Sequence, residues 1–199
     1  SDGTLDILNE YKNSIDCLVS EPDKGIYDAM NKAIDLASGE WIIFMNAGDR
    51  FFNQHVIQNF IKADSDADVV YGNMQWGETD KINKPRELKD FWLGMPFNHQ
   101  SVFTKTSLHK KRKFDLKYKI SSVYDFYYFY FRGGAKFEKI DLIIAIYDMD
   151  GISAFSYLRL VDYWKIVNKY SNQPKIKILF RSFYIFLRIL KKNLSKYIK

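Results

Sequence analysis

The 199-residue chain has little of what several common classes of protein require. Its one cysteine, Cys17, excludes a disulfide within the chain and favours a reducing compartment. No apolar run approaches the ~20 residues of a membrane-spanning helix, and we find no signal peptide. The chain opens at Ser1-Asp2-Gly3-Thr4 without an initiator methionine, so we expect a fragment or a processed product.

Acidic residues are missing from one part of the chain. Residues 175–199 contain eight lysines and arginines and no aspartate or glutamate, so the formal net charge of +6 becomes −2 without them. The segment also mixes aliphatic and aromatic residues with the basic ones, which is typical of a helix lying on an anionic membrane surface. A helix docked on its own domain is the alternative. No nucleic-acid-binding module is recognisable, so we expect no nucleic acid partner.

The rest of the composition is that of a folded domain. Apolar residues make up 47% of the chain and aromatic residues 17%, enough for a substantial core. We predict one domain over residues 1–172 and a basic amphipathic C-terminal helix over residues 173–199, with the boundary near Asn172-Gln173-Pro174.

Helical and strand patterns alternate along the chain. The spacing of apolar residues and the turn signals predict helices at 5–13, 27–37, 54–63 and 121–134, and strands at 15–20, 41–45, 67–76, 99–105 and 135–148. Residues 79–97 are expected to form a loop with a short helix. This order predicts an α/β fold, with a mixed, mostly parallel sheet flanked by helices. Most rings of the aromatic helix are expected to lie in the core.

The strand at 41–45 ends on Asn46-Ala47-Gly48-Asp49. Open α/β sheets bind ligands at the carboxyl ends of their strands. Asp49 offers a carboxylate, Asn46 a neutral oxygen, and Gly48 lets a ligand approach the backbone. A divalent cation bound to a diphosphate takes only one or two protein carboxylates. The pattern therefore indicates either a metal–diphosphate site or an ordinary turn.

Five segments of the chain resemble a known family in their order. They are "SDGT" at 1–4, the block from 21 to 49, "PFNHQSVF" at 96–103, "YDF" at 124–126 and "GIS" at 151–153. The chain resembles a family-2 glycosyltransferase of the GT-A fold over roughly residues 1–153, and is most similar to the bacterial branch that builds exopolysaccharide and capsule. That family begins with a strand and a helix that bind the nucleotide base, and this chain starts after them.

The resemblance implies roles for individual residues. Asp49 would hold a divalent cation, Mn²⁺ or Mg²⁺. The usual general base has its counterpart at Val123, so the resemblance leaves Asp125 as the catalytic base. The residues implied to bind the nucleotide-sugar donor are Asp2, Asp23, Gly25, Asp28, Asn31, Lys32, Asn46, His99 and Gln100.

The function that the resemblance implies is inverting transfer of a sugar to a lipid-linked or polysaccharide acceptor in cell-surface polysaccharide synthesis. With the basic C-terminal helix, we expect a peripheral protein on the cytoplasmic face of the cell membrane. The alternative hypothesis is a non-catalytic GT-A-like remnant that binds membrane or a partner enzyme, which Val123 and the absent first strand favour.

Overall fold

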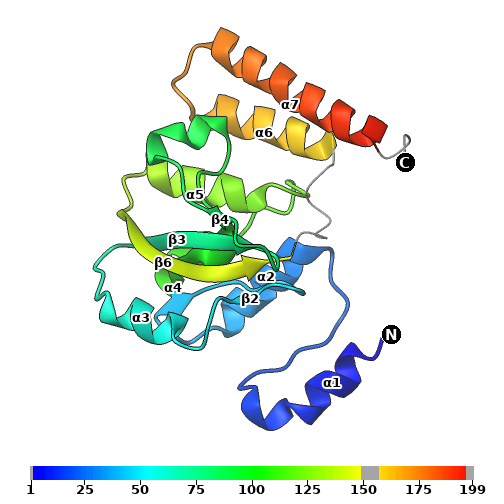
Figure 1. Ribbon diagram of the computed structural model, residues 1–199, viewed down its shortest axis with the longest axis vertical. Coiled ribbons are helices and arrows are strands. Elements are labelled where there is room, and N and C mark those ends of the chain that lie inside the picture. Colours follow the sequence, from blue (N-terminus) through cyan, green and yellow to red (C-terminus); the bar gives the residue numbers. More distant parts are fainter. Residues whose placement is uncertain (1, 149–156, 196–199) are drawn as a thin grey trace.

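The computed structural model describes residues 2–148 and 157–195. Its centre is a six-stranded sheet with helices on both faces, so the expected mixed α/β fold is confirmed (Figure 1). The strands are β1 (Trp41–Ile42), β2 (Arg50–Phe51), β3 (Val69–Trp76), β4 (Ile82–Asn83), β5 (Val102–Lys105) and β6 (Phe137–Tyr147). Their order is β1-β5-β3-β6-β2, with β4 paired to β3.

The strand directions differ from the mostly parallel expectation. Within the described residues, β3 and β6 pair in parallel, whereas the other four pairings are antiparallel. The reason lies in the connections. The chain returns from β3 to β6 through β5 and two helices, which supplies the long crossover that a parallel pair needs.

The helices occupy most of the predicted segments. They are α1 (Thr4–Glu10), α2 (Ile26–Leu36), α3 (Val56–Lys62), α4 (Thr106–Lys111), α5 (Ser122–Arg132), α6 (Tyr157–Tyr170) and α7 (Lys175–Ser195), with short 3₁₀ turns η1 (Lys12–Ser14), η2 (Leu88–Leu93) and η3 (His99–Ser101). On one side of the sheet α5, α6 and α7 stack as successive layers, and α3 lies on the other side (Figure 1).

The prediction of a strand at 15–20 is wrong. These residues follow α1 as an irregular segment that leaves Leu18 and Val19 exposed, and α1 itself stands apart from the body of the molecule (Figure 1). A strand needs a neighbour to satisfy its backbone groups. Among the described residues no other strand pairs with this segment.

The apolar run at 41–45 is shorter as a strand than predicted, because only Trp41 and Ile42 pair with β5. Its continuous pattern nevertheless has the expected cause. Ile42 and Phe44 pack into the core on one face of the sheet, whereas Trp41, Ile43 and Met45 pack into the core on the other. Both faces of this segment are therefore covered.

The larger core is built from aromatic rings, as expected for the aromatic helix. Phe91 of η2 is fully buried and stacks on Tyr128 and Phe131 of α5, with ring centroids 5.2 and 4.9 Å apart. On the opposite face of the sheet, Phe60 of α3 stacks on Phe103 of β5 at 3.8 Å. These contacts fix the two helical layers on either side of the strands.

The C-terminal helix packs on its own chain along one face. Ile178 and Ser182 are buried there, and Ile185 packs against the larger core. Arg181 donates a hydrogen bond to the carbonyl oxygen of Leu93 at 2.9 Å. Within residues 2–148 and 157–195, no helix is both long and apolar enough to cross a membrane.

His109 predicts a pH dependence of folding. It is fully buried between the rings of Phe44, Phe114 and Phe126, and neither ring nitrogen has a hydrogen-bond partner within the described structure. Burial lowers the pKa of His109 from 6.5 to about 4. Between about pH 6.5 and pH 4, His109 is therefore protonated in the unfolded chain but neutral in the folded chain. The free energy of unfolding therefore falls as the pH drops toward 4.

We expect His109→Leu to reduce this loss of stability, between about pH 7.5 and about pH 4.5, by about 2–3 kcal/mol. Urea unfolding of both proteins across that range measures it. His55→Leu, which removes an exposed histidine, is the control. Equal pH dependence in wild type and His109→Leu would contradict the assignment.

Candidate functional site

Residues 46–49 form a tight turn between β1 and β2. The backbone N–H of Asp49 donates to the carbonyl oxygen of Asn46 at 3.0 Å, and Gly48 at the third position has φ +87°. A positive φ at this position belongs to a type II turn and favours glycine. The turn points the Asp49 side chain toward residues contributed by other strands.

Both carboxylate oxygens of Asp49 are held. Oδ2 accepts a hydrogen bond from Nε2 of Gln100 at 3.0 Å, and Oδ1 accepts one from the backbone N–H of Asp148 at 3.0 Å. Gln100 is almost fully buried in η3, directly before β5, and Asp148 follows the end of β6. Two distant segments therefore orient one carboxylate, and each of its oxygens keeps a further lone pair.

Asn46 and His99 make a second contact between the same segments. Nδ2 of Asn46 lies 3.0 Å from Nε2 of His99. Burial lowers the pKa of His99 to about 4, against the opposing effect of the Asp49 carboxylate. The ring is therefore neutral near pH 7, and its Nε2 can accept the hydrogen bond from Asn46. The structure thus brings Asn46, Asp49, His99 and Gln100 together, and their roles toward a donor and a cation stay predictions.

Asp148 was missed by sequence reasoning. Its side chain lies against the turn so closely that a Cβ on Gly48 would stand 2.2 Å from its Oδ2 and 2.9 Å from its own Cβ. Beside this contact is a hollow of about 370 Å³ lined by the turn, Arg50, Glu78 and the ends of β3 and β6. An aspartate as the last residue of the strand predicted at 135–148 was the available signal, because carboxyl ends of strands gather at one edge of a sheet.

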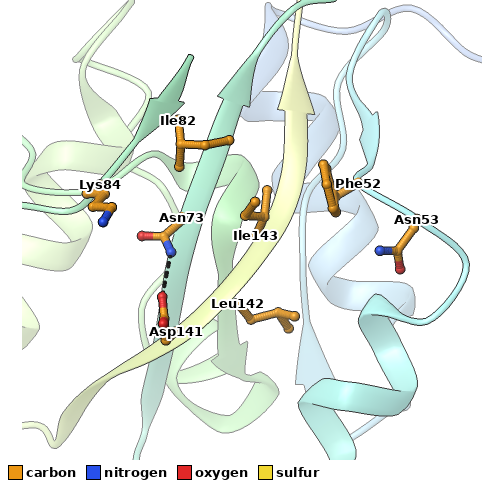
Figure 2. Close-up of a pocket in the computed structure, with 8 residues that line it drawn as sticks. All are labelled: Phe52, Asn53, Asn73, Ile82, Lys84, Asp141, Leu142 and Ile143. Carbon is orange, nitrogen blue, oxygen red and sulfur yellow. Dashed lines mark hydrogen bonds between the residues drawn. The ribbon is translucent and has the colours of Figure 1, made fainter. Parts of the chain in front are cut away.

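A second hollow, of about 390 Å³, lies over the middle of the sheet (Figure 2). Figure 2 shows Asn73 of β3 pointing to Asp141 of β6, with a hydrogen bond of 3.0 Å between them. Lys84 approaches from the side of β4, and Phe52 from beyond β2. The turn at 46–49 does not line this hollow. The polar side chains described above, Asn46, Asp49 and Gln100, gather at the turn, so we place the candidate site there.

The structure places Asp125 in a buried ion-pair network, apart from the turn at 46–49. The side chain is 1% exposed and belongs to an ion-pair network between α5 and α6. Its Oδ2 pairs with Arg112, and its Oδ1 accepts from the Tyr170 hydroxyl at 3.0 Å and lies 3.4 Å from the Lys169 ammonium. A general base must reach the proton of an acceptor hydroxyl. Both oxygens of the Asp125 carboxylate are engaged by these neighbours, and its role as a base stays a prediction.

The predicted donor residues near the start of α2 form a separate group. Asp23 accepts from the N–H of Gly25 at 2.7 Å, Asp28 accepts from the N–H of Lys24 at 2.9 Å, and Lys32 pairs with Glu21 at 2.6 Å. These contacts organise the entrance of α2 and include none with the turn at 46–49. A donor role for Asp23, Gly25, Asp28 and Lys32 stays a prediction.

Asp2 and Asn31 also lie apart from the turn. Asp2 is exposed. Its Oδ1 accepts hydrogen bonds from Thr4, the first residue of α1, at 3.1 Å from the N–H and 2.7 Å from the hydroxyl. The side-chain amide of Asn31 makes two hydrogen bonds of 2.9 Å with the backbone of Phe114. Asn31 therefore holds α2 against the loop before α5, which the sequence did not predict, and the donor contacts of both residues stay predictions.

A model described as glycosyl transferase family 2 matches residues 1–136. The chain belongs to glycosyltransferase family 2. The match includes the turn at 46–49 together with His99 and Gln100, and it ends before Asp148.

Curated relatives of this family-2 chain are glycosyltransferases. A PGL/p-HBAD biosynthesis glycosyltransferase of Mycobacterium tuberculosis is 28% identical over 143 residues, which cover 63% of this chain and 52% of the relative. An uncharacterised glycosyltransferase of Methanocaldococcus jannaschii is 24% identical over 93% of this chain and 73% of its own length. The chain thus spans about half the length of the mycobacterial relative.

Solved structures of the GT-A fold share the architecture. Residues 1–349 of Staphylococcus aureus TarS, in complex with UDP, superpose with a TM-score of 0.65 and 15% identity, over 98% of this chain and 60% of that fragment. The mannosyltransferase PcManGT of Pyrobaculum calidifontis, in complex with GDP-Man and Mn²⁺, gives a TM-score of 0.63 and 16% identity, over 92% and 57%. At these identities the likeness establishes the GT-A fold.

The turn carries the kinds of ligand that a divalent cation prefers. Asp49 and Asn46 offer carboxylate and amide oxygens, the hard ligands that Mn²⁺ and Mg²⁺ prefer, and the Asp148 carboxylate lies against the same turn. Within the described residues no three His, Cys, Asp or Glu side chains gather as a metal-binding group. A cation here would therefore depend on ligands from the diphosphate and from water as well.

Gly48→Ala tests how closely the turn and Asp148 fit. We expect the substitution to lower the free energy of unfolding by more than about 2 kcal/mol, through backbone strain and displacement of Asp148. Gly134→Ala is the matched control, because Gly134 has φ +82° but no atom within 4 Å of an added Cβ. Chemical denaturation measures both. Equal losses in the two variants would mean that Asp148 yields freely.

Asp125→Asn tests the structural role of the Asp125 ion-pair network. Removing its charge leaves Arg112 and Lys169 without their buried partner, so we expect the free energy of unfolding to fall by about 2–4 kcal/mol. Asp35→Asn, which breaks an exposed pair with Lys113, should change it by less than about 1 kcal/mol. Wild-type stability of Asp125→Asn, measured by urea unfolding, would contradict this structural role of Asp125.

Proposed function

We propose that this chain is the catalytic domain of an inverting glycosyltransferase that moves a hexose from a nucleotide-sugar donor to a lipid-linked or polysaccharide acceptor, in the synthesis of a cell-surface polysaccharide such as capsule or exopolysaccharide. The observation that carries the proposal is the orientation of Asp49. Its two oxygens are fixed from two other segments at 3.0 Å each, on a glycine turn beside an open hollow. Family membership supports the reaction class.

Each residue at the turn has a part in this proposal. Asp49 and Asn46 present oxygens to the cation that accompanies the donor diphosphate. When bound, that cation neutralises negative charge building on the leaving diphosphate. Gln100 and the N–H of Asp148 hold the Asp49 carboxylate in one orientation before the donor arrives. Neutral His99 holds Asn46 and stays uncharged near the donor sugar.

One observation favours a second candidate function, a domain that binds the donor without turnover. Inverting transfer requires a base within about 2.6–3.2 Å of the acceptor hydroxyl. At the family's position for this base the chain has Val123, which is buried, and the carboxylate of Asp125 is enclosed by its ion pairs. The non-catalytic hypothesis therefore makes a different prediction, namely donor binding with no transfer.

Donor binding is tested by melting the protein with a panel of UDP- and GDP-sugars, with and without Mn²⁺. A donor at ~100 times its dissociation constant adds ~2.7 kcal/mol of stability, which raises the melting temperature by roughly 5–10 °C at this size. We expect Asp49→Asn to abolish the Mn²⁺-dependent part of the shift, and Asp35→Asn to retain it. No shift with any donor, or a full shift in Asp49→Asn, would contradict the proposed site.

Turnover separates the two candidate functions. For the donor that gives a Mn²⁺-dependent shift, release of nucleoside diphosphate is measured with a membrane extract as the source of acceptor. Release that depends on the extract and on Asp49 supports the transferase. Binding without release supports the non-catalytic domain.

A further inference from the structure

Helix α7 carries two apolar faces, and only one of them is used by the fold. The inner face buries Ile178 and Ser182 against α6 and the aromatic core. The outer face remains uncovered in the described structure. Its large apolar side chains include Ile176, Leu179, Phe180, Phe183, Leu187 and Leu190, with exposed fractions between 37% and 68%.

The spacing places these side chains on one continuous stripe. Ile176, Phe180, Phe183, Leu187 and Leu190 follow one another at intervals of four, three, four and three residues, which is the repeat of a single helix face. α7 is also the outermost layer of the molecule, on the side away from the sheet (Figure 1). Scattered exposed apolar residues are ordinary, whereas a contiguous stripe on a soluble domain marks an interaction surface.

The charge of the helix indicates the chemistry of its partner. Residues 175–199 carry eight basic residues and no acidic one, whereas the rest of the chain has a net charge of −2. Lys175 and Lys177 are exposed at the start of the helix. A partner must therefore be both apolar and negatively charged. A second copy of α7 is apolar but would bring the same positive charge against the first.

Helix α6, which packs beside α7, adds a shorter stripe of the same kind. Leu158, Val161 and Trp164 recur every three residues and are 52%, 47% and 51% exposed. Tryptophan is enriched where protein meets the boundary between lipid headgroups and acyl chains, because its ring is apolar and its N–H is polar. Two adjacent helices thus expose large apolar side chains beside a basic segment.

We propose that the outer face of α7, together with the exposed stripe of α6, docks on an anionic phospholipid surface. The apolar side chains enter the boundary between headgroups and acyl chains, and the lysines and arginines pair with lipid phosphates. The helix would lie along the surface while its inner face stays packed on the domain. This interaction involves neither the donor site nor turnover, so it can be measured without any substrate.

The test is flotation with vesicles of phosphatidylcholine alone and of phosphatidylcholine with phosphatidylglycerol. We expect the protein to bind the anionic vesicles, more weakly at high salt, and to leave the neutral vesicles largely unbound. In the double variant Phe180→Ser and Phe183→Ser the partition constant should fall at least ~tenfold, because two large side chains no longer enter the lipid. Both positions are exposed, so the fold should be retained, which circular dichroism checks.

Ile61→Ser is the matched control, because Ile61 is 65% exposed on α3, across the sheet from α7, and its loss should leave binding unchanged. The inference is overturned if anionic vesicles do not bind the protein, or if the Phe180/Phe183 variant binds as well as wild type. It is also overturned if light scattering shows a dimer that the same variant converts to a monomer, since the stripe would then be covered by a second copy.

Discussion

The parallel pairing of β3 with β6 is the constraint on which the rest of this structure depends. The two strands approach so closely that a Cβ on Gly72 would stand 2.4 Å from the carbonyl oxygen of Leu142. The register shifts at this point and then continues to Trp76 beside Tyr147. β6 also pairs with β2 in antiparallel fashion, with Arg50 opposite Ile146, and this register places Asp148 against Gly48 of the turn at 46–49. A site between residues 99 positions apart in the chain is thus set by strand pairing.

Buried polar groups secure the helical layers on this sheet. Asp125 brings Arg112, Lys169 and Tyr170 together and ties α5 to α6, and α6 in turn supports α7. Such a network is expensive to break, since removing a cationic member leaves the buried Asp125 carboxylate with less compensating charge. Asp125 therefore has a structural role in this chain, beside the catalytic role that the family resemblance implies for it.

The proposed donor site and the proposed membrane surface belong to different parts of the fold. The first lies where the strands end, and the second on the outermost helix of the stack above them (Figure 1). A glycosyltransferase acting on a lipid-linked acceptor needs both, because its acceptor stays in the membrane while its donor arrives from water. The two proposals rest on separate residues, so each can fail without the other.

Much of this arrangement could be predicted from local sequence. Periodicity predicts the helices near 27–37, 54–63 and 121–134, and turn chemistry predicts the glycine turn before Asp49. The block at 21–49 indicates the family. Neighbouring residues carry all of these signals. Three features depend on the tertiary structure. They are the irregular conformation of residues 15–20, the ion-pair network around Asp125, and the position of Asp148 at the turn. Each depends on a partner far away in the chain: a strand to pair with, Tyr170 beside Asp125, and Gly48 against Asp148. Local patterns describe what a segment prefers, whereas packing determines which distant group it meets.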